Sequence, residues 1–568
     1  MQTIGHILVS KGVISEDQLK EVLKEKTGFL KHALIKMGLT TEEDFLEIIA
    51  EQYGATFLNL KETPIDPEAV KVVPAKFAWH YQIMPVNLVG RTLVVATADP
   101  EATNLLEDLE TNLGYLVEEH FATTADIREA IRRHYGVAAD TVERILDRDK
   151  PDAEGGIESS LEKVEDLERM SEDASVIRLV NQILLQAITD RATDVHIELY
   201  RDEVALRYRI DGILYSAEIP ENIKYLHAAI VSRIKVMSGL DIIEKRLPQD
   251  GRSKVRIGDK DYDLRVSTIP TLYGESVVIR ILPLTMLFSI SDLGMAPQDM
   301  AITEKLLTKP YGLFFVTGPT GCGKSTTLYS WLTKLNTPEH KIVTIEDPVE
   351  YELKGVSQAQ VNPRIDMTFA RLLRSVLRHD PNVMMIGEVR DFETAEIAIQ
   401  AALTGHLVFS TLHTNDAASG ITRLLDIGVE PFLVISSVSA FIAQRLVRVI
   451  CSHCKSPLII TPEQAATIQS SPVQGGATFW KGKGCSACRK TGYLGRTGLF
   501  EILVMNGNIG ELIAEKTSSA IIKTAAIEQG MHTLREDGWE KAQAGITTIE
   551  EVLRVTQADQ GHENAIEA

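Results

Sequence analysis

The chain has 568 residues, of which 44% are hydrophobic and 24% are charged, ordinary values for a soluble globular protein. At about 150 residues per domain, this length predicts roughly three or four domains and excludes a single small module. Lys and Arg number 59 against 79 Asp and Glu, and the net charge of −20 disfavours a dedicated nucleic-acid binder. We expect a cytoplasmic protein, because no apolar run reaches the roughly 18 residues of a membrane-spanning helix and the first residues lack a signal-peptide pattern.

An internal repeat marks residues 1–55. The segment that begins at Leu8 recurs at Leu34, an offset of 26 residues. In each copy a hydroxyl residue, Ser15 or Thr41, precedes acidic residues and then apolar residues spaced i, i+3, i+4. This pattern predicts helix N-caps and two helical hairpins packed together.

Three further segments precede the part of the chain that carries the motifs. Residues 56–139 combine a strand candidate at 92–97 with a helix at 124–135, which predicts a small α/β module. Residues 140–173 hold 13 acidic and 5 basic residues and few large apolar groups, which predicts a linker. Residues 174–290 alternate a helix with strands, which predicts a second N-terminal domain of the α+β class.

Strand, turn and helix repeat through residues 291–505. The apolar strand candidates are LFFVT, KIVTIE, NVMMIGE and LVFSTLH, and helical stretches separate them. This alternation predicts an α/β domain with a parallel sheet and helical crossovers. We expect residues 506–568 to form a C-terminal helical region that ends in a frayed tail.

The motif GPTGCGKST lies between the strand LFFVT and a helix, and it satisfies the phosphate-binding pattern G-x-x-x-x-G-K-[ST]. Its glycines let backbone amides converge on phosphate oxygens at a helix N-terminus. Lys324 balances the phosphate charge, the Ser325 hydroxyl ligates Mg²⁺, and Cys322 is a small filler of the loop. The predicted binding residues are Gly318, Pro319, Thr320, Gly321, Cys322, Gly323, Lys324, Ser325 and Thr326.

Hydrolysis also requires carboxylates that hold the metal and orient a water molecule. Glu346 ends the strand KIVTIE, and Glu388 ends NVMMIGE. A carboxylate at the end of an apolar strand carries a desolvation cost that metal or water activation explains, so we expect both to act in catalysis. His406 and His413 bracket the strand LVFSTL, and their spacing alone leaves both a structural role and a phosphate contact open.

Four of the 5 cysteines form two CxxC pairs, Cys451 with Cys454 and Cys485 with Cys488, with 30 residues between the pairs. Turn-forming residues flank the pairs, and the pattern predicts a structural tetrathiolate Zn²⁺ site in a module of residues 445–500. Redox-active pairs are the alternative, which the lack of a thioredoxin-like strand and helix disfavours. The zinc knuckle is also an expected docking surface for a membrane partner.

Four blocks together resemble the secretion ATPase superfamily, whose members drive type II secretion, type IV pilus extension and pilus retraction. The blocks are GPTGCGKST, TIEDPVEY, RHDPNVMMIGEVRDFETAEIA and TGHLVFSTLHTN, and the resemblance covers at least residues 174–555. It implies a RecA-like P-loop fold and ATP hydrolysis in a homohexameric ring. It also implies mechanical work on an inner-membrane platform, to which the protein is peripherally attached.

The same resemblance implies roles for the site residues. Lys324, Ser325 and Thr326 bind phosphates and Mg²⁺. Glu346 activates water, and Glu388 acts at the metal and the γ-phosphate. The residues expected to sense the nucleotide state are His406 and His413.

The domain before the P-loop resembles the second N-terminal domain of the superfamily, through DVHIE, RYRIDG, KRLPQDGR and DLRVSTIPTLYGESVVIRIL. In the rings of that superfamily this domain packs beside the nucleotide, so Arg265 and Arg280 are expected to reach the phosphate charge. Their spacing alone leaves them open as ordinary solvated strand arginines.

The choice within the superfamily depends on a few segments. A retraction motor is disfavoured, because it would lack both the long N-terminal extension and the four cysteines. VTIEDPVEY and QVNPRIDMTFARLLRSVLRHDP resemble the type II secretion members, which assemble a pseudopilus for protein export. A pilus-extension motor is the alternative. Two further rivals are a DNA translocase, which the negative charge opposes, and a nucleotide-dependent scaffold without turnover.

The opening block TIGHILVSKGVISEDQLKEVLKEK resembles the MshEN-type N-terminal domain, which binds cyclic di-GMP in some relatives. The pattern of that domain has Arg before Leu-Gly, whereas Thr3 precedes Ile4 and Gly5 here. Because groups that contact the ligand are missing, we expect no cyclic di-GMP binding. The expected role is docking on a cytoplasmic protein of the platform, with an acidic phospholipid surface as a further partner.

Overall fold

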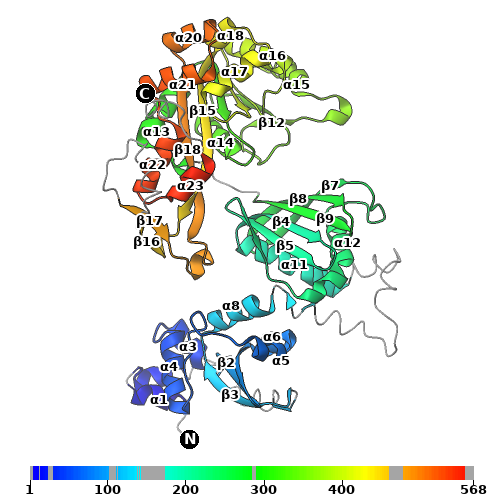
Figure 1. Ribbon diagram of the computed structural model, residues 1–568, viewed down its shortest axis with the longest axis vertical. Coiled ribbons are helices and arrows are strands. Elements are labelled where there is room, and N and C mark those ends of the chain that lie inside the picture. Colours follow the sequence, from blue (N-terminus) through cyan, green and yellow to red (C-terminus); the bar gives the residue numbers. More distant parts are fainter. Residues whose placement is uncertain are drawn as a thin grey trace, which may run out of the picture. The chain divides into compact units, whose positions relative to one another are not determined.

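The computed structural model describes residues 4–11, 13–22, 30–100, 110–111, 113–136, 138–139, 141–142, 173–283, 289–458 and 478–556 (Figure 1). The chain divides into two units, Met1–Leu282 and Pro283–Ala568, and each is described by itself. The predicted linker lies almost wholly outside the described residues, and so does the predicted tail after residue 556.

Four short helices open the first unit and confirm the predicted hairpins. They are α1 (Ile4–Ser10), α2 (Glu16–Val22), α3 (Leu30–Lys36) and α4 (Glu42–Tyr53). The side chains of Ser15 and Thr41 each accept the backbone amide three residues later, at 3.2 and 3.1 Å, so both predicted N-caps form. Leu8 and Leu34, which are equivalent in the repeat, are fully buried in one shared core.

A small three-stranded sheet with helices packed against it follows in the same unit. Its elements are α5 (Pro67–Val72), α6 (Ala75–Tyr81), β1 (Ile83–Val89), β2 (Thr92–Thr97), β3 (Leu116–Phe121) and α8 (Thr124–Tyr135). β1 pairs antiparallel with β2, and β2 pairs parallel with β3. The predicted α/β module is thus confirmed, with its strand at 92–97 and its helix at 124–135.

The rest of the first unit is a six-stranded sheet, in the order β6-β5-β4-β9-β8-β7, that shares its core with two long helices. The elements are α11 (Ala174–Thr189), β4 (Ala192–Leu199), β5 (Val204–Ile210), β6 (Ile213–Ser216), η2 (Glu221–Leu226), α12 (His227–Met237), β7 (Gln249–Ile257), β8 (Lys260–Pro270) and β9 (Glu275–Pro283). This is the predicted α+β domain.

A seven-stranded sheet in the order β12-β11-β13-β14-β10-β15-β18 forms the centre of the second unit (Figure 1). The strands are β10 (Gly312–Thr317), β11 (Ile342–Glu346), β12 (Ser357–Gln360), β13 (Val383–Ile386), β14 (Leu407–Leu412), β15 (Val438–Ile450) and β18 (Tyr493–Val504). All neighbouring pairs from β12 to β15 are parallel, whereas β18 runs antiparallel to β15. The predicted parallel sheet is confirmed, with one antiparallel strand at its edge.

Helices cover both faces of this sheet, which explains why its strands read as continuous apolar runs. On one face Phe315 of β10 stacks on Phe441 of β15, with ring centroids 5.4 Å apart. On the other face Phe314 and Trp331 both pack against Phe409. The covering elements are η3 (Ile290–Leu293), α13 (Pro297–Leu307), α14 (Lys324–Leu335), α15 (Phe369–Val376), α16 (Phe392–Leu403), α17 (Ala418–Asp426) and α18 (Pro431–Ser437). The short helix η4 (Pro363–Ile365) buries no residue.

The cysteine module is smaller than predicted. β15 and β18 pair as far as Ile450 and Tyr493, so residues 445–450 and 493–500 belong to the central sheet. Between these strands lie β16 (Lys455–Leu458), β17 (Phe479–Gly482) and η5 (Ser486–Cys488), of which the first two form a separate antiparallel pair. The sequence could not reveal this limit, because a strand that continues into an insertion has the same apolar pattern on both sides of the boundary.

Four C-terminal helices belong to the same unit. They are α20 (Gly507–Ala514), α21 (Ser519–Glu528), α22 (Leu534–Gln543) and α23 (Ile549–Val555). α22 and α23 pack on the sheet, where they contact β18 and β15, whereas α20 and α21 pack on α18 and α17. Among the described residues, no helix combines the length and the apolar character needed to cross a membrane.

Candidate functional site

The phosphate-binding motif forms a tight loop between β10 and α14, as predicted. Gly318 and Gly323 have φ angles of 149° and 92°, which disfavour any residue with a side chain. A Cβ on Gly318 would lie 2.5 Å from the Cys322 sulfur, and one on Gly323 would lie 2.8 Å from the Gln444 amide nitrogen. Only glycine therefore fits at these two positions, and the loop presents its backbone at the start of a 12-residue helix, a favourable site for phosphate.

Lys324 is the first residue of that helix, and its ammonium group is folded back onto the loop. Nζ donates to the carbonyl oxygens of Gly318 at 2.7 Å and Pro319 at 3.0 Å. Burial lowers the pKa of Lys324, and the charge of Glu388 opposes that shift. The group is thus held at the mouth of the loop, where phosphate oxygens would replace the two carbonyls.

Three of the predicted catalytic residues lie at the same edge of the sheet, because the carboxyl ends of parallel strands meet there. Glu346 ends β11, and His413 directly follows β14. Glu388 does not end its strand as predicted: β13 stops at Ile386, two residues earlier. The loop after β10 opens at this edge too, so the P-loop and these three side chains form one site.

Glu388 is buried and is the charged centre of this edge. Its carboxylate pairs with Arg390 at 2.6 Å and lies 3.4 Å from the His413 Nε2 atom. The pKa of His413 is lowered by burial and by the Lys324 charge, and Glu388 works against both. The charges of Lys324, Glu388 and His413 therefore interact with one another, and the three side chains form one electrostatic cluster.

Glu346 is buried too, but its carboxylate points into the protein. One oxygen accepts hydrogen bonds from Thr344 at 2.6 Å and Gln358 at 3.0 Å, and the other accepts one from Tyr329. Burial and the Glu346 charge together raise the pKa of Tyr329. These three hydrogen bonds occupy three of about four lone-pair sites of the carboxylate and tie α14, β11 and β12 together. The role of Glu346 in activating water stays a prediction.

Glu350 is a second carboxylate on the segment that follows β11, and it was not among the predicted site residues. It is half-buried, and its backbone amide donates to the Tyr329 hydroxyl at 3.3 Å. The Glu346–Tyr329 pair thereby fixes the backbone that carries Glu350. The signal was present in the sequence, because TIEDPVEY contains a second glutamate four residues after the first.

The two histidines lie at opposite ends of the same strand, β14. His406 precedes β14, and the backbone amide of Gly312, at the start of β10, donates to its carbonyl at 3.1 Å. Its ring nitrogen Nδ1 lies 2.9 Å from the Ala401 carbonyl oxygen. β14 has 6 residues, which at about 3.3 Å each separates the two edges by roughly 20 Å. The chain therefore brings His413 to the nucleotide site and does not bring His406 there.

Arg445 and Gln444 border the loop and were not predicted. Arg445 is buried, and the position of a Cβ on Gly318 lies 3.1 Å from its Nη1 atom. Gln444 accepts a hydrogen bond from Thr327 at 2.7 Å. Both residues come from β15, whose pairing with β10 could not be deduced from the spacing of motifs.

Arg265 and Arg280 belong to the first unit. Arg265 is on β8, and its guanidinium lies 3.8 Å from Asp263. Arg280 is on β9, is about half-exposed, and donates to Asp194 at 3.1 Å. Each arginine has a carboxylate beside it within its own sheet.

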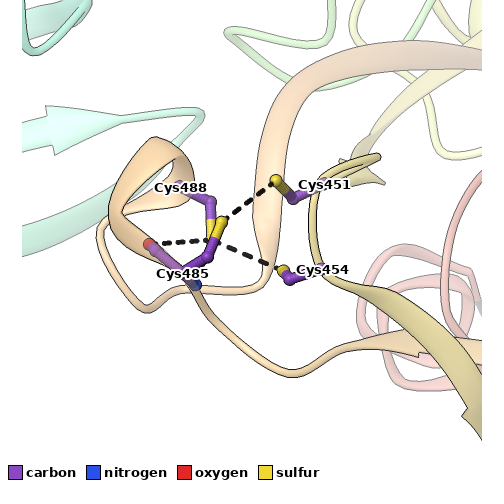
Figure 2. A group of neighbouring side chains, drawn as sticks. All are labelled: Cys451, Cys454, Cys485 and Cys488. Carbon is purple, nitrogen blue, oxygen red and sulfur yellow. Dashed lines mark hydrogen bonds between the residues drawn. The ribbon is translucent and has the colours of Figure 1, made fainter. Parts of the chain in front are cut away.

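The four paired cysteines converge into one cluster (Figure 2). All four sulfur atoms lie within 4.8 Å of one another. Cys451 is 3.8 Å from Cys485, Cys454 is 3.8 Å from Cys488, and Cys485 is 3.7 Å from Cys488. A tetrahedral Zn²⁺ with bonds of about 2.3 Å separates its sulfur ligands by roughly 3.8 Å, so the residues fit this ion.

Hydrogen bonds from backbone amides also indicate that the four cysteines can bind a metal ion. Gly484 donates to the Cys454 sulfur at 3.3 Å, and Gly492 donates to the Cys488 sulfur at 3.3 Å. Amide hydrogen bonds stabilise thiolates, the form that binds metal. Redox-active pairs would need no contact between the two CxxC motifs, whereas here each motif supplies half of one sulfur cluster.

A glycine loop between a buried parallel strand and a helix, with a lysine and a carboxylate at the same sheet edge, defines a P-loop nucleotide hydrolase. Comparison with known families places it more closely. The chain belongs to the Type II/IV secretion system protein family, whose model matches residues 169–554, and it is an ATPase of that family. The expected class, a secretion or pilus motor ATPase, is confirmed.

Both a type IV pilus assembly ATPase and a type II secretion system protein are similar to this chain. The type IV pilus assembly ATPase PilB of Myxococcus xanthus is 42% identical over 563 residues, which cover 98% of this chain and 99% of that protein. The type II secretion system protein E of Dickeya dadantii is 42% identical over 505 residues, which cover 88% of this chain and 100% of that protein. The solved structure of the pilus retraction motor PilT with bound ADP is 26% identical, with a TM-score of 0.47, and covers 67% of this chain and 98% of that one.

A second family model, the MshEN domain, matches residues 53–141. That segment contains the small α/β module, whereas the expected resemblance rested on the opening repeat. The expectation that no cyclic di-GMP binds rested on Thr3, which lies outside the matched segment, and it stays a prediction.

Proposed function

We propose that this protein is a hexameric, ATP-hydrolysing motor that assembles a type II secretion pseudopilus from the cytoplasmic side of the inner membrane. The observation that carries the proposal is the meeting of the P-loop, Glu388 and His413 at one sheet edge, in a chain of the secretion ATPase family. We further propose that the N-terminal region docks on the membrane platform, as the resemblance implies.

The chemistry follows from the groups at this edge. Loop amides and Lys324 bind the phosphates of ATP, and the hydroxyls of Ser325 and Thr326 lie exposed in the first turn of α14. We propose that Ser325 and Glu388 hold Mg²⁺, a cation that prefers oxygen ligands, while His413 reports the state of the γ-phosphate. Mg²⁺ supplies charge neutralisation on the phosphates when it is bound.

We propose Glu350 as the group that orients the attacking water, in place of Glu346. Glu346 already accepts three hydrogen bonds, whereas Glu350 lies four residues further on the same segment and its backbone amide is held by the Tyr329 hydroxyl. A general base needs a lone pair directed at the water, and three of about four lone-pair sites of Glu346 already accept hydrogen bonds from the protein.

Arg265 and Arg280 are proposed to supply positive charge to the phosphates within the ring. The domain that carries them is the one that packs beside nucleotide in the superfamily it resembles. An arginine that reaches the transferred phosphoryl group accelerates hydrolysis by about 10³- to 10⁵-fold.

A pilus-extension motor is the second candidate, and one observation favours it. The match to the pilus assembly ATPase spans 98% of this chain, whereas the match to the type II secretion protein spans 88%. The two candidates share the catalytic site and differ in the platform that they engage. Stimulation of ATP turnover by the cytoplasmic domain of one platform protein and not the other would distinguish them.

The zinc knuckle offers a surface for an acidic partner at the membrane. Around the cysteines, Lys481, Lys483, Arg489 and Lys490 are exposed, although the whole chain carries a net charge of −20. Residues 478–498 contain no Asp or Glu. We propose that this basic surface contacts acidic phospholipid, since each cation near such a membrane contributes about 1 kcal/mol.

The test measures ATP turnover of the full chain with vesicles of phosphatidylglycerol and the cytoplasmic domain of the platform protein. We expect stimulation in the wild type, and we expect the double variant Lys481→Glu, Lys483→Glu to keep its basal rate and lose the response to vesicles. The matched control reverses two exposed lysines elsewhere in the same unit, Lys305→Glu with Lys354→Glu, and should respond like the wild type. Stimulation by DNA instead of vesicles would favour the translocase and overturn the proposal.

A further inference from the structure

The turn after β14 contacts the nucleotide site on one side and the C-terminal helices on the other. It comprises residues 413–417, and it begins with His413, whose ring lies 3.4 Å from Glu388. The position of this turn therefore sets the distance between His413 and the catalytic carboxylate.

On the nucleotide side, two groups tie the turn to the base of the P-loop. Arg445, which packs beside Gly318, donates to the carbonyl oxygen of Asn415 at 2.7 Å. Thr317, the last residue before the loop, donates to the carbonyl oxygen of Asp416 at 3.5 Å. A displacement of the turn 413–417 would therefore also displace the groups that border the P-loop.

On the opposite side, Glu501 of β18 holds the turn from within the core. It is nearly fully buried, and its carboxylate accepts the backbone amide of Ala417 at 2.8 Å and that of Leu534, at the start of α22, at 3.4 Å. Burial raises the pKa of Glu501, and the nearby Lys523 charge opposes that shift. The carboxylate thus joins the turn to the first residue of a C-terminal helix.

Lys523 of α21 completes the connection. Its Nζ atom lies 3.6 Å from Glu501 and 3.9 Å from the side chain of Asp416, so one cation stands between two carboxylates of different elements. Removing this cation would leave a buried acid without its ionic partner, which is costly unless the surroundings move. Asp416 belongs to the turn itself, and Glu501 holds the turn through the Ala417 amide.

We propose that Lys523 and Glu501 are positioning residues for ATP hydrolysis, which make the rate depend on how the helices α21 and α22 sit against the turn 413–417. A partner or a load that displaces these helices then changes turnover without touching nucleotide. The inference rests on the ATPase activity of the family and not on the choice between secretion and pilus assembly.

The test compares three variants of the full chain with the wild type. Lys523→Met should lower kcat by about 2- to 30-fold, the range typical of couplings that act through a packed network, with little change in KM for ATP. Lys523→Arg, which restores the charge, should recover most of the rate. Lys235→Met is the matched control, because Lys235 is a buried lysine paired with Glu275 at 2.6 Å in the first unit, whereas the turn and the helices α21 and α22 belong to the second. It should lower the melting temperature and keep kcat at a temperature where it is folded.

A double-mutant cycle tests whether Lys523 affects kcat through the position of His413. If Lys523 acts by placing His413, the effects of Lys523→Met and His413→Ala on kcat should be non-additive, with the double variant close to His413→Ala alone. Unchanged kcat in Lys523→Met would overturn the inference, as would additive effects in the cycle. An equal loss of kcat in Lys235→Met would also overturn it, because the loss would then reflect general destabilisation.

Discussion

Replacing Glu350 with Gln is expected to lower kcat for ATP hydrolysis by about 10²- to 10⁴-fold, the contribution of a positioned general base. Nucleotide binding should stay intact, because the loop amides and Lys324, which we propose to hold the phosphates, are unchanged. Single-turnover hydrolysis and the binding of a fluorescent ATP analogue measure the two effects separately. The melting temperature of this variant should stay near that of the wild type.

Glu346→Gln is the matched comparison and should behave differently. An amide cannot accept from all three donors that its carboxylate serves, so one buried donor loses its partner. That loss costs about 1–3 kcal/mol of folding free energy and should lower the melting temperature along with activity. A stable Glu346→Gln variant with normal binding and no turnover, beside an active Glu350→Gln, would reverse the two assignments.

Replacing Cys454 with Ser is expected to release about one zinc ion per chain. A structural tetrathiolate site binds Zn²⁺ with about 10–16 kcal/mol, and this stabilisation is lost with one ligand, because the described part of the module between β15 and β18 has few other buried apolar side chains. Metal analysis of the purified chains measures the loss, and increased proteolysis of residues 451–492 reports the unfolding of the module.

Cys322→Ser is the control for the zinc prediction. Cys322 is also buried, but it lies in the P-loop and outside the sulfur cluster. This variant should retain its zinc. A wild-type protein purified without zinc under metal-replete conditions, or a Cys454→Ser variant that retains a full equivalent, would contradict the tetrathiolate assignment.

Local signals predicted a large part of the fold. Ser15 and Thr41 cap their helices as expected, and the strand at 92–97 has the predicted limits, because both features depend on residues adjacent in sequence. The P-loop and the sulfur cluster were predicted for a related reason. Their chemistry requires fixed residue types at fixed spacing, whatever surrounds them.

Features that depend on which strands are neighbours could not be predicted. Arg445 reaches the P-loop only because β15 pairs with β10, which no motif records. His406 and His413 looked equivalent as the two ends of one strand, yet a parallel strand has only one end at the catalytic edge. The donors that lock Glu346 come from α14 and β12, so its burial gave no sign that its lone pairs were occupied.

The most direct test of the central claim is steady-state ATP turnover of the purified full chain with Mg²⁺, compared with the variant Lys324→Ala. Lys324 is the cation that we propose to bind the phosphates, and its ammonium lies 2.7 Å from the Gly318 carbonyl oxygen of the loop. The account predicts turnover in the wild type and at least a hundredfold loss, about 2.7 kcal/mol of transition-state stabilisation, in the variant. Equal turnover in the two proteins would contradict it.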